Sequence, residues 1–162
     1  MDFNDTPEEA GFRADVRRFL EANAKRRSAT ETAHRGRYIP DANMAESLAR
    51  AKEWQAKKAD AGFAAITWPK KWGGRGGSPI EQVIYNQEEA NYAVPRGAFE
   101  IGLGMCIPTM MAYATPQQLE RHVRPALRGK EVWCQLFSEP AAGSDLRWTA
   151  HARRTLGRRL DH

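Results

Sequence analysis

The residues best suited to chemistry lie together near the C-terminal end of the sequence. Residues 138–145 read SEPAAGSD and directly follow VWCQLF, a short run of β-branched and aromatic residues that predicts a strand. Gly143 permits a positive φ, and Ser138, Ser144 and Asp145 offer hydroxyl and carboxylate groups that can bind a ligand at a strand end. A turn of this composition also occurs with a purely structural role. These residues alone leave both interpretations open.

Other reactive side chains occur singly. His34 and His122 have no neighbouring pattern that predicts a catalytic pair. Cys106 and Cys134 are two lone thiols, which are more typical of small buried apolar residues than of a disulfide or a metal site. We therefore expect no metal site and assign no catalytic role to these four residues.

Three helices are predicted by their starting residues. Thr6, Ser78 and Thr115 each stand directly before a proline, as a capping residue does before the first turn of a helix. We expect helices from residue 7 to about 24, from 79 to 89 and from 116 to 127. The first helix places four apolar residues on one face, namely Phe12, Val16, Phe19 and Leu20, and the 79–89 helix places Ile80, Val83, Ile84 and Gln87 on one side.

Two further helices are predicted by apolar residues between loops. One carries Met44, Leu48, Ala51 and Trp54, and a small-residue, Met-rich stretch from 97 to 111 is expected to be buried. Residues 62–79 hold too many glycines and prolines for a helix, so they are expected to form a loop in which Trp68 and Trp72 are anchors packed on the helices.

Composition and charge narrow the class of protein. The chain has 162 residues, 41% of them hydrophobic, which suits one modest core. An acidic N-terminus and the lack of a long apolar run argue against a secretory signal or a membrane span, so we expect a cytoplasmic protein. Residues 147–162 contain five arginines and one aspartate, and thus +4 of the net charge of +5. The basic character therefore belongs to the tail.

The sequence up to residue 146 resembles the acyl-CoA dehydrogenase family. The matching stretches occur in the family's order and spacing: residues 62–78, the Glu88-Glu89 helix end, residues 115–119, residues 124–129 and residues 132–146, which correspond to the family's flavin signature. The resemblance implies a mainly α fold, with the family's N-terminal helical domain in residues 1–130 and the first strand of its middle β-barrel domain within residues 131–146. Residues 147–162 do not match.

The resemblance also implies a function. Members oxidise a fatty acyl-CoA to the trans-2-enoyl-CoA with FAD, and an electron-transferring flavoprotein usually accepts the electrons. It implies flavin contacts in this chain at Gln135, Leu136, Phe137, Ser138, Gly143 and Ser144, with Ser144 also touching the CoA portion of the substrate. The family's glutamate base would lie beyond residue 162, so no catalytic residue is expected within this chain. A homo-oligomer is expected for the intact enzyme, without nucleic acid as a partner.

The tail has its own explanation. Residues 147–162 read RWTAHARRTLGRRLDH, which has neither strand alternation nor a helical stripe. Their possible codons, read one base later, permit a Gly-Leu-x-Thr strand and a turn into Trp, as in the family. We therefore expect a shift of reading frame after Leu146 and an inactive N-terminal fragment. Two alternatives remain: a related flavin oxidase or monooxygenase of the same fold, and a non-enzymatic helical module whose basic tail binds nucleic acid.

Overall fold

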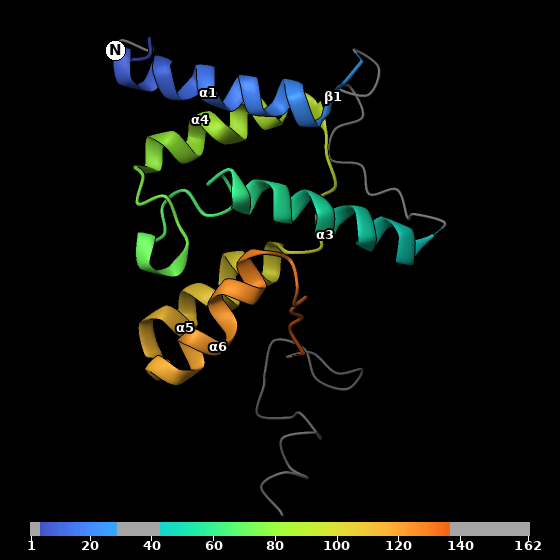
Figure 1. Ribbon diagram of the computed structural model, residues 1–162, viewed down its shortest axis with the longest axis vertical. Helices are drawn as coiled ribbons and strands as arrows, with labels where there is room; N and C mark the ends of the chain where they lie inside the picture. Colours follow the sequence, from blue (N-terminus) through green and yellow to red (C-terminus); the bar gives the residue numbers. More distant parts are fainter. Residues whose placement is uncertain (1–3, 29–42, 137–162) are drawn as a thin grey trace, which may run out of the picture.

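The computed structural model describes residues 4–28 and 43–136, and these residues are mostly helical (Figure 1). In chain order the elements are α1 (Pro7–Asn23), β1 (Lys25–Arg26), α3 (Met44–Asp60), η1 (Lys70–Trp72), α4 (Pro79–Glu89), β2 (Tyr92–Ala93), η2 (Gly102–Cys106), α5 (Ile107–Tyr113) and α6 (Pro116–Leu127). In Figure 1, α3 runs between the α1–α4 pair and the α5–α6 pair. The fold class predicted from the sequence is confirmed for the helical domain.

Capping residues set the starts of these helices. The side chains of Thr6, Ser78 and Thr115 each accept a hydrogen bond from the backbone N–H three residues on, and the side chain at that position accepts one from the backbone N–H of the cap. The side chain of Asn43 caps α3 by accepting a hydrogen bond from the backbone N–H of Glu46. Such caps satisfy amide groups that the first turn of a helix leaves unpaired. The predicted helix starts are confirmed.

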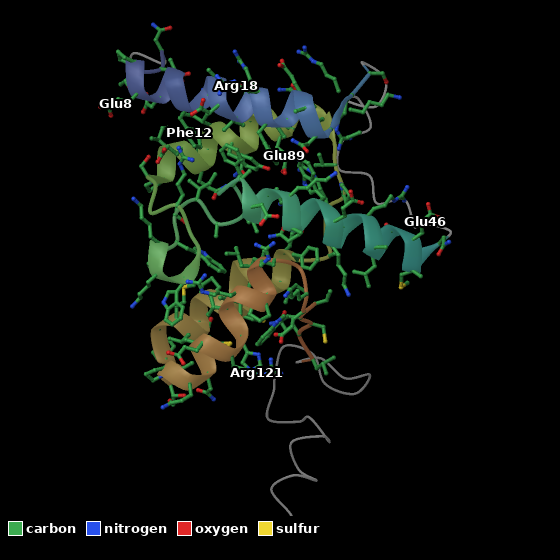
Figure 2. All side chains as sticks on the ribbon, viewed as in Figure 1. Glu8, Phe12, Arg18, Glu46, Glu89 and Arg121 are labelled. Atoms are coloured by element: carbon green, nitrogen blue, oxygen red, sulfur yellow. The ribbon has the colours of Figure 1, made fainter. Side chains whose placement is uncertain are left out.

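The first core joins α1, α3 and α4. Phe12, Val16 and Leu20 of α1 are buried against a cluster that includes Trp54, Phe63, Ile66, Ile84, Tyr85 and Tyr92. Figure 2 shows Phe12 on the side of α1 that faces α4. The strand β1, which follows α1 in the chain, pairs antiparallel with β2. Lys25 lies opposite Ala93, and Arg26 lies opposite Tyr92. This short sheet fixes the chain that leaves α1 against the chain that leaves α4.

The second core joins α5 and α6. It contains Ile107, Leu119, Val123 and Ala126, and seven half-buried residues pack against it, among them Trp68, Trp72 and Trp133. The two tryptophans of the glycine-rich loop are therefore anchors, as predicted. Gln55 of α3 is buried and its Nε2 donates a hydrogen bond of 2.8 Å to the carbonyl of Leu127 at the end of α6. That bond connects the two cores.

Two helical segments are buried differently from what their apolar residues suggest. On α4 the buried residues are Ile84, Tyr85 and Glu88, whereas Ile80 and Val83 are exposed. The reason is that an ion-paired glutamate shares the buried face, which an apolar pattern does not reveal. The stretch 97–111 is helical from residue 100, but η2 is a π-helix and its Met105 is 51% exposed.

The structure also differs at the predicted strand. Residues 132–136, the first five of VWCQLF, belong to neither a helix nor a strand, and Phe137 lies outside the described residues. A strand needs a partner for its backbone groups. Among the described residues, the sheet consists of β1 and β2, which pair with each other.

Candidate functional site

The predicted flavin residues begin where α6 gives way to an extended segment, residues 131–136. Gln135 and Leu136 are described and exposed, Leu136 to 84%. The other predicted contacts, Phe137, Ser138, Gly143 and Ser144, lie outside the described residues, as do Asp145 and the basic tail. The structure therefore places the start of the predicted site and not its turn.

Trp133 fixes the direction of this segment. Its side chain packs on the second core, and its Cβ would lie 3.2 Å from a Cβ added at Gly102 of η2. Glu131 lies 3.3 Å from Nη1 of Arg121 and 3.2 Å from Nδ1 of His122. The segment is thus held on α6 by Glu131 and on η2 by Trp133, while the residues that follow extend into solvent.

His122 occurs singly in the sequence, but the structure gives it two neighbours. Its ring contacts Glu131 and meets the ring of Trp133 edge-on, with 5.3 Å between centroids. The sequence gives no local signal for this contact, because Glu131 is nine positions away across the end of α6. Held by Glu131 and Trp133, His122 positions the extended segment.

The extended segment has the chemistry that a polar cofactor edge needs. Within the described residues, the backbone groups of Cys134, Gln135 and Leu136 make no hydrogen bond to other backbone groups. Unpaired N–H and C=O groups of this kind require water or a ligand as partner. Such groups can meet a partner that both donates and accepts hydrogen bonds, as the pyrimidine ring of a flavin does, and they are open to water as well.

A cavity of about 460 Å³ lies between α3, α4 and the chain from Pro95 to Leu103. Figure 2 shows Glu89 on the side of α4 that faces α3. Apolar walls come from Ala51, Trp54, Phe99 and Leu103, and four charged residues also line the cavity, namely Lys58, Glu89, Arg96 and Glu100. None of these four was predicted as a site residue.

Glu89 is the centre of the charged part of the cavity. Its carboxylate accepts a hydrogen bond of 2.9 Å from the hydroxyl of Tyr85 and lies 3.9 Å from Lys58 Nζ and 3.6 Å from Arg96 Nη2. Burial raises the pKa of Tyr85, and the neighbouring charge of Glu89 raises it further, so Tyr85 remains a donor. Burial lowers the pKa of Lys58, although the charge of Glu89 opposes this shift.

The described part of the chain has neither a membrane-spanning helix nor a cluster of metal ligands. No helix there is long and apolar enough to cross a membrane. The same residues contain no group of three or more His, Cys, Asp or Glu side chains arranged to hold a metal ion.

Comparison with known proteins assigns the fold to a family. The family described as "Acyl-CoA dehydrogenase, N-terminal domain" matches residues 6–130. This match covers most of the chain, and the chain therefore belongs to the acyl-CoA dehydrogenase family, which is a family of flavoprotein oxidoreductases. The resemblance seen in the sequence is confirmed.

Curated relatives extend beyond this chain. It is 41% identical over 134 residues to acyl-CoA dehydrogenase FadE34 of Mycobacterium tuberculosis, which covers 81% of this chain and 19% of that protein. It is 36% identical over 135 residues to acyl-CoA dehydrogenase IpdE1 of Mycolicibacterium smegmatis, covering 83% of this chain and 33% of that protein. The chain thus spans a third or less of the length of these two relatives.

Solved structures show the same helical fold. The ChsE4-ChsE5 complex from Mycobacterium tuberculosis matches 92% of this chain and 35% of its own chain, with a TM-score of 0.61 and 26% identity. A protein described as Tcur3481-Tcur3483 steroid ACAD matches with a TM-score of 0.62 and 25% identity, again over 92% of this chain and 36% of that chain.

Proposed function

We propose that this chain supplies the N-terminal helical domain and the first flavin-contacting segment of an FAD-dependent acyl-CoA dehydrogenase. The observation that carries the proposal is the family match over residues 6–130, followed directly by an extended segment with unpaired backbone groups at 134–136. We place the domain boundary near residue 131, where α6 has ended and Glu131 ties the chain back to His122.

In this proposal the chain helps to bind and orient FAD and the acyl-CoA, and it does not itself remove the α-proton of the substrate. Bound FAD would supply the acceptor for the β-hydride of an acyl-CoA thioester. The backbone of Gln135 and Leu136, followed by Phe137, Ser138, Gly143 and Ser144, would line one edge of the cofactor, and Ser144 would also meet the CoA portion. The cavity beside Glu89 would receive the acyl group, since its walls combine apolar rings with a few polar groups, as ligand sites commonly do.

The partners follow from the same proposal. An electron-transferring flavoprotein would accept the electrons, and the intact enzyme would be a cytoplasmic oligomer. Two solved relatives favour an oligomer, because the ChsE4-ChsE5 complex and the Tcur3481-Tcur3483 steroid ACAD are each named after two chains. We therefore propose assembly with a second, different chain as an alternative to the homo-oligomer.

We further propose that the 162-residue chain alone is inactive. A flavin is retained by convergent groups from a largely closed pocket, whereas the described part of this chain offers one exposed segment. Proton abstraction also needs a carboxylate within hydrogen-bond reach of the α-proton.

Sequencing the DNA across codon 146 should reveal the family pattern continuing in the shifted frame.

The test compares the 162-residue chain with a frame-restored chain. Each is purified, its flavin absorption is recorded, and a panel of acyl-CoA thioesters is added without oxygen. We expect colourless protein from the first and yellow protein that bleaches with substrate from the second. A yellow, substrate-bleached 162-residue chain would contradict its inactivity, and a colourless restored chain would contradict the proposed function.

The same assay distinguishes a dehydrogenase from an oxidase or monooxygenase. Relatives include a protein named 3-(aryl)acrylate reductase from Clostridium sporogenes, at 29% identity, so the fold is not limited to dehydrogenation. Rapid reoxidation of the reduced flavin by oxygen would favour an oxidase or monooxygenase. Slow reaction with oxygen and fast reaction with a flavoprotein acceptor would favour the dehydrogenase.

A further inference from the structure

Lys58 is a mostly buried amine that faces a cavity. Its side chain is 18% exposed, and it lines the cavity of about 460 Å³ between α3, α4 and the chain from Pro95 to Leu103. The walls around it include the apolar side chains of Ala51 and Trp54. The ammonium form of a lysine loses hydration free energy in such surroundings, whereas the neutral amine loses much less. Burial therefore favours the amine over the ammonium ion.

Lys58 has no carboxylate to itself. Its Nζ is 3.9 Å from Oε1 of Glu89, beyond hydrogen-bond distance, and the same oxygen accepts a hydrogen bond of 2.9 Å from the hydroxyl of Tyr85. Arg96 Nη2 lies 3.6 Å from the other oxygen of Glu89. Burial lowers the pKa of Lys58, and the charge of Arg96 lowers the pKa further. The charges of Glu89 and Glu100 oppose this shift only in part.

A lysine in this setting is suited to act as a nucleophile. A desolvated amine beside a second cation is neutral more often than an amine in water, and only the neutral form has the lone pair that attacks a carbonyl carbon. The exposed part of Lys58 leaves it open to a small molecule from solvent. The next lysine on α3 differs, because Lys57 is 45% exposed and pairs with Glu53 at 2.9 Å.

We propose that Lys58 is a covalent modification site at which an aldehyde forms an imine. The nitrogen of the neutral amine bonds to the aldehyde carbon, and the carbonyl oxygen leaves as water with the two amine protons. The step needs no oxidant and no reductant. The apolar walls suit a short hydrocarbon chain on the aldehyde, namely Ala51, Trp54, Phe99 and Leu103. The site involves no flavin and is independent of the proposed dehydrogenase activity.

The test labels the folded 162-residue chain with butanal at neutral pH. Cyanoborohydride is present to reduce each imine to a stable secondary amine, and mass spectrometry of the peptides gives the rate at each lysine. We expect Lys58 to react at least about threefold faster than Lys57, because the neutral fraction of the amine sets the rate. In urea the two lysines should react equally, since unfolding removes the burial and the charges around Lys58.

Two variants should change this ratio of rates in opposite directions. Arg96→Met removes the neighbouring cation and should lower the ratio of Lys58 to Lys57 by about twofold or more, whereas Glu89→Gln removes the nearest negative charge and should raise the ratio. Arg18→Met is the matched control and should leave the ratio unchanged. Arg18 is an exposed arginine that pairs with an acid, as Arg96 does, but it does not line the cavity.

The outcomes that would overturn the proposal are distinct. Equal rates at Lys58 and Lys57 in the folded chain would show that the buried amine is not the more reactive one. A ratio that stays the same in urea would show that the fold does not cause the difference. Changes of the same sign in Arg96→Met and Glu89→Gln would show that access to the cavity, and not the charge around Lys58, sets the rate.

Discussion

Glu88 is the buried carboxylate that holds α4 on α1. It accepts hydrogen bonds of 2.9 Å from Arg13 Nη1, Arg17 Nε and Arg17 Nη2, and Arg13 also pairs with Asp5. Removing one partner of a buried pair leaves the others desolvated and unpaired, which costs more than the pair itself contributes. The position of this group at the helix interface makes it a sensitive point for stability.

The substitution Glu88→Gln should therefore destabilise the chain. We expect a loss of about 2 kcal/mol in the free energy of unfolding, below the full cost of a buried pair because Arg17 is half exposed. The control is Asp15→Asn, which removes an exposed pair with Arg18 and should cost less than about 0.5 kcal/mol. Urea unfolding measures both, and equal effects of the two variants would contradict the role given to Glu88.

Glu88 should also make stability depend on pH. Burial raises its pKa, but the hydrogen bonds from Arg17 and Arg13 outweigh burial and hold the pKa below the ordinary value of 4.5. Because the folded pKa is the lower one, the contribution of Glu88 is present above pH 4.5 and is lost as the pH falls through the folded pKa. Unfolding curves across this range should show a smaller acid loss in Glu88→Gln than in the natural sequence.

At the scale of elements, the glycine-rich loop fits closely around its own backbone. A Cβ on Gly74 would collide with the backbone carbonyl oxygen of Trp68, which cannot move aside as a side-chain end does. The N–H of Gly76 donates to that same carbonyl, and Arg75 lies over the ring of Phe12 with 4.9 Å between its Cζ and the ring centroid. The loop is therefore packed on the first core.

Two glycine substitutions should have opposite effects. Gly74→Ala should cost at least about 2 kcal/mol, because the backbone around Trp68 has to shift. Gly11 lies inside α1 with no atom within 4 Å of an added Cβ, so Gly11→Ala should gain about 0.5–1 kcal/mol from helix propensity. Thermal melts of both variants test this, and a neutral Gly74→Ala would show that the loop is not held as described.

The elements also show what the sequence can and cannot predict. Helix starts at Thr6, Ser78 and Thr115 depend on local bonds within four residues, so their signals are fully present in the sequence. The buried face of α4 depends on Glu88 meeting arginines more than seventy positions away, and the apolar pattern points to a different face. Hydrophobic periodicity detects apolar packing and misses a buried ion pair.

The candidate site was predictable to a smaller extent. Gln135 and Leu136 were identified through family resemblance, and their exposed, unpaired backbone is consistent with that role. Lys58, Glu89 and Arg96 were missed, because they belong to three separate segments that meet only through the packing of α3 against α4. A cavity is a property of that packing and has no spacing in the sequence.

At the scale of the whole molecule, the described chain has two modest cores and a partly apolar surface. The cores are connected by contacts between α3 and α6, including the Gln55 bond to Leu127 and a pair between Arg128 and Asp60 at 2.6 Å. Four large apolar side chains near η2 and the extended segment are exposed by a third or more: Ile101, Met105, Val132 and Leu136. Apolar surface that stays exposed to water does not contribute the stabilisation that its burial would give.

We therefore predict that the 162-residue chain is marginally stable and self-associates through this surface. Its free energy of unfolding should be about 5 kcal/mol or less, at the low end for a domain, and it should bind a hydrophobic dye in its native state. Met105→Lys, at a side chain that is 51% exposed, should lower both dye binding and association without loss of stability. Met44→Lys is the control, because Met44 is 81% exposed but is the first residue of α3 and does not pack on the second core. A monomer that melts sharply at high temperature and binds no dye would contradict the prediction, and equal effects of the two lysine variants would move the association surface away from η2.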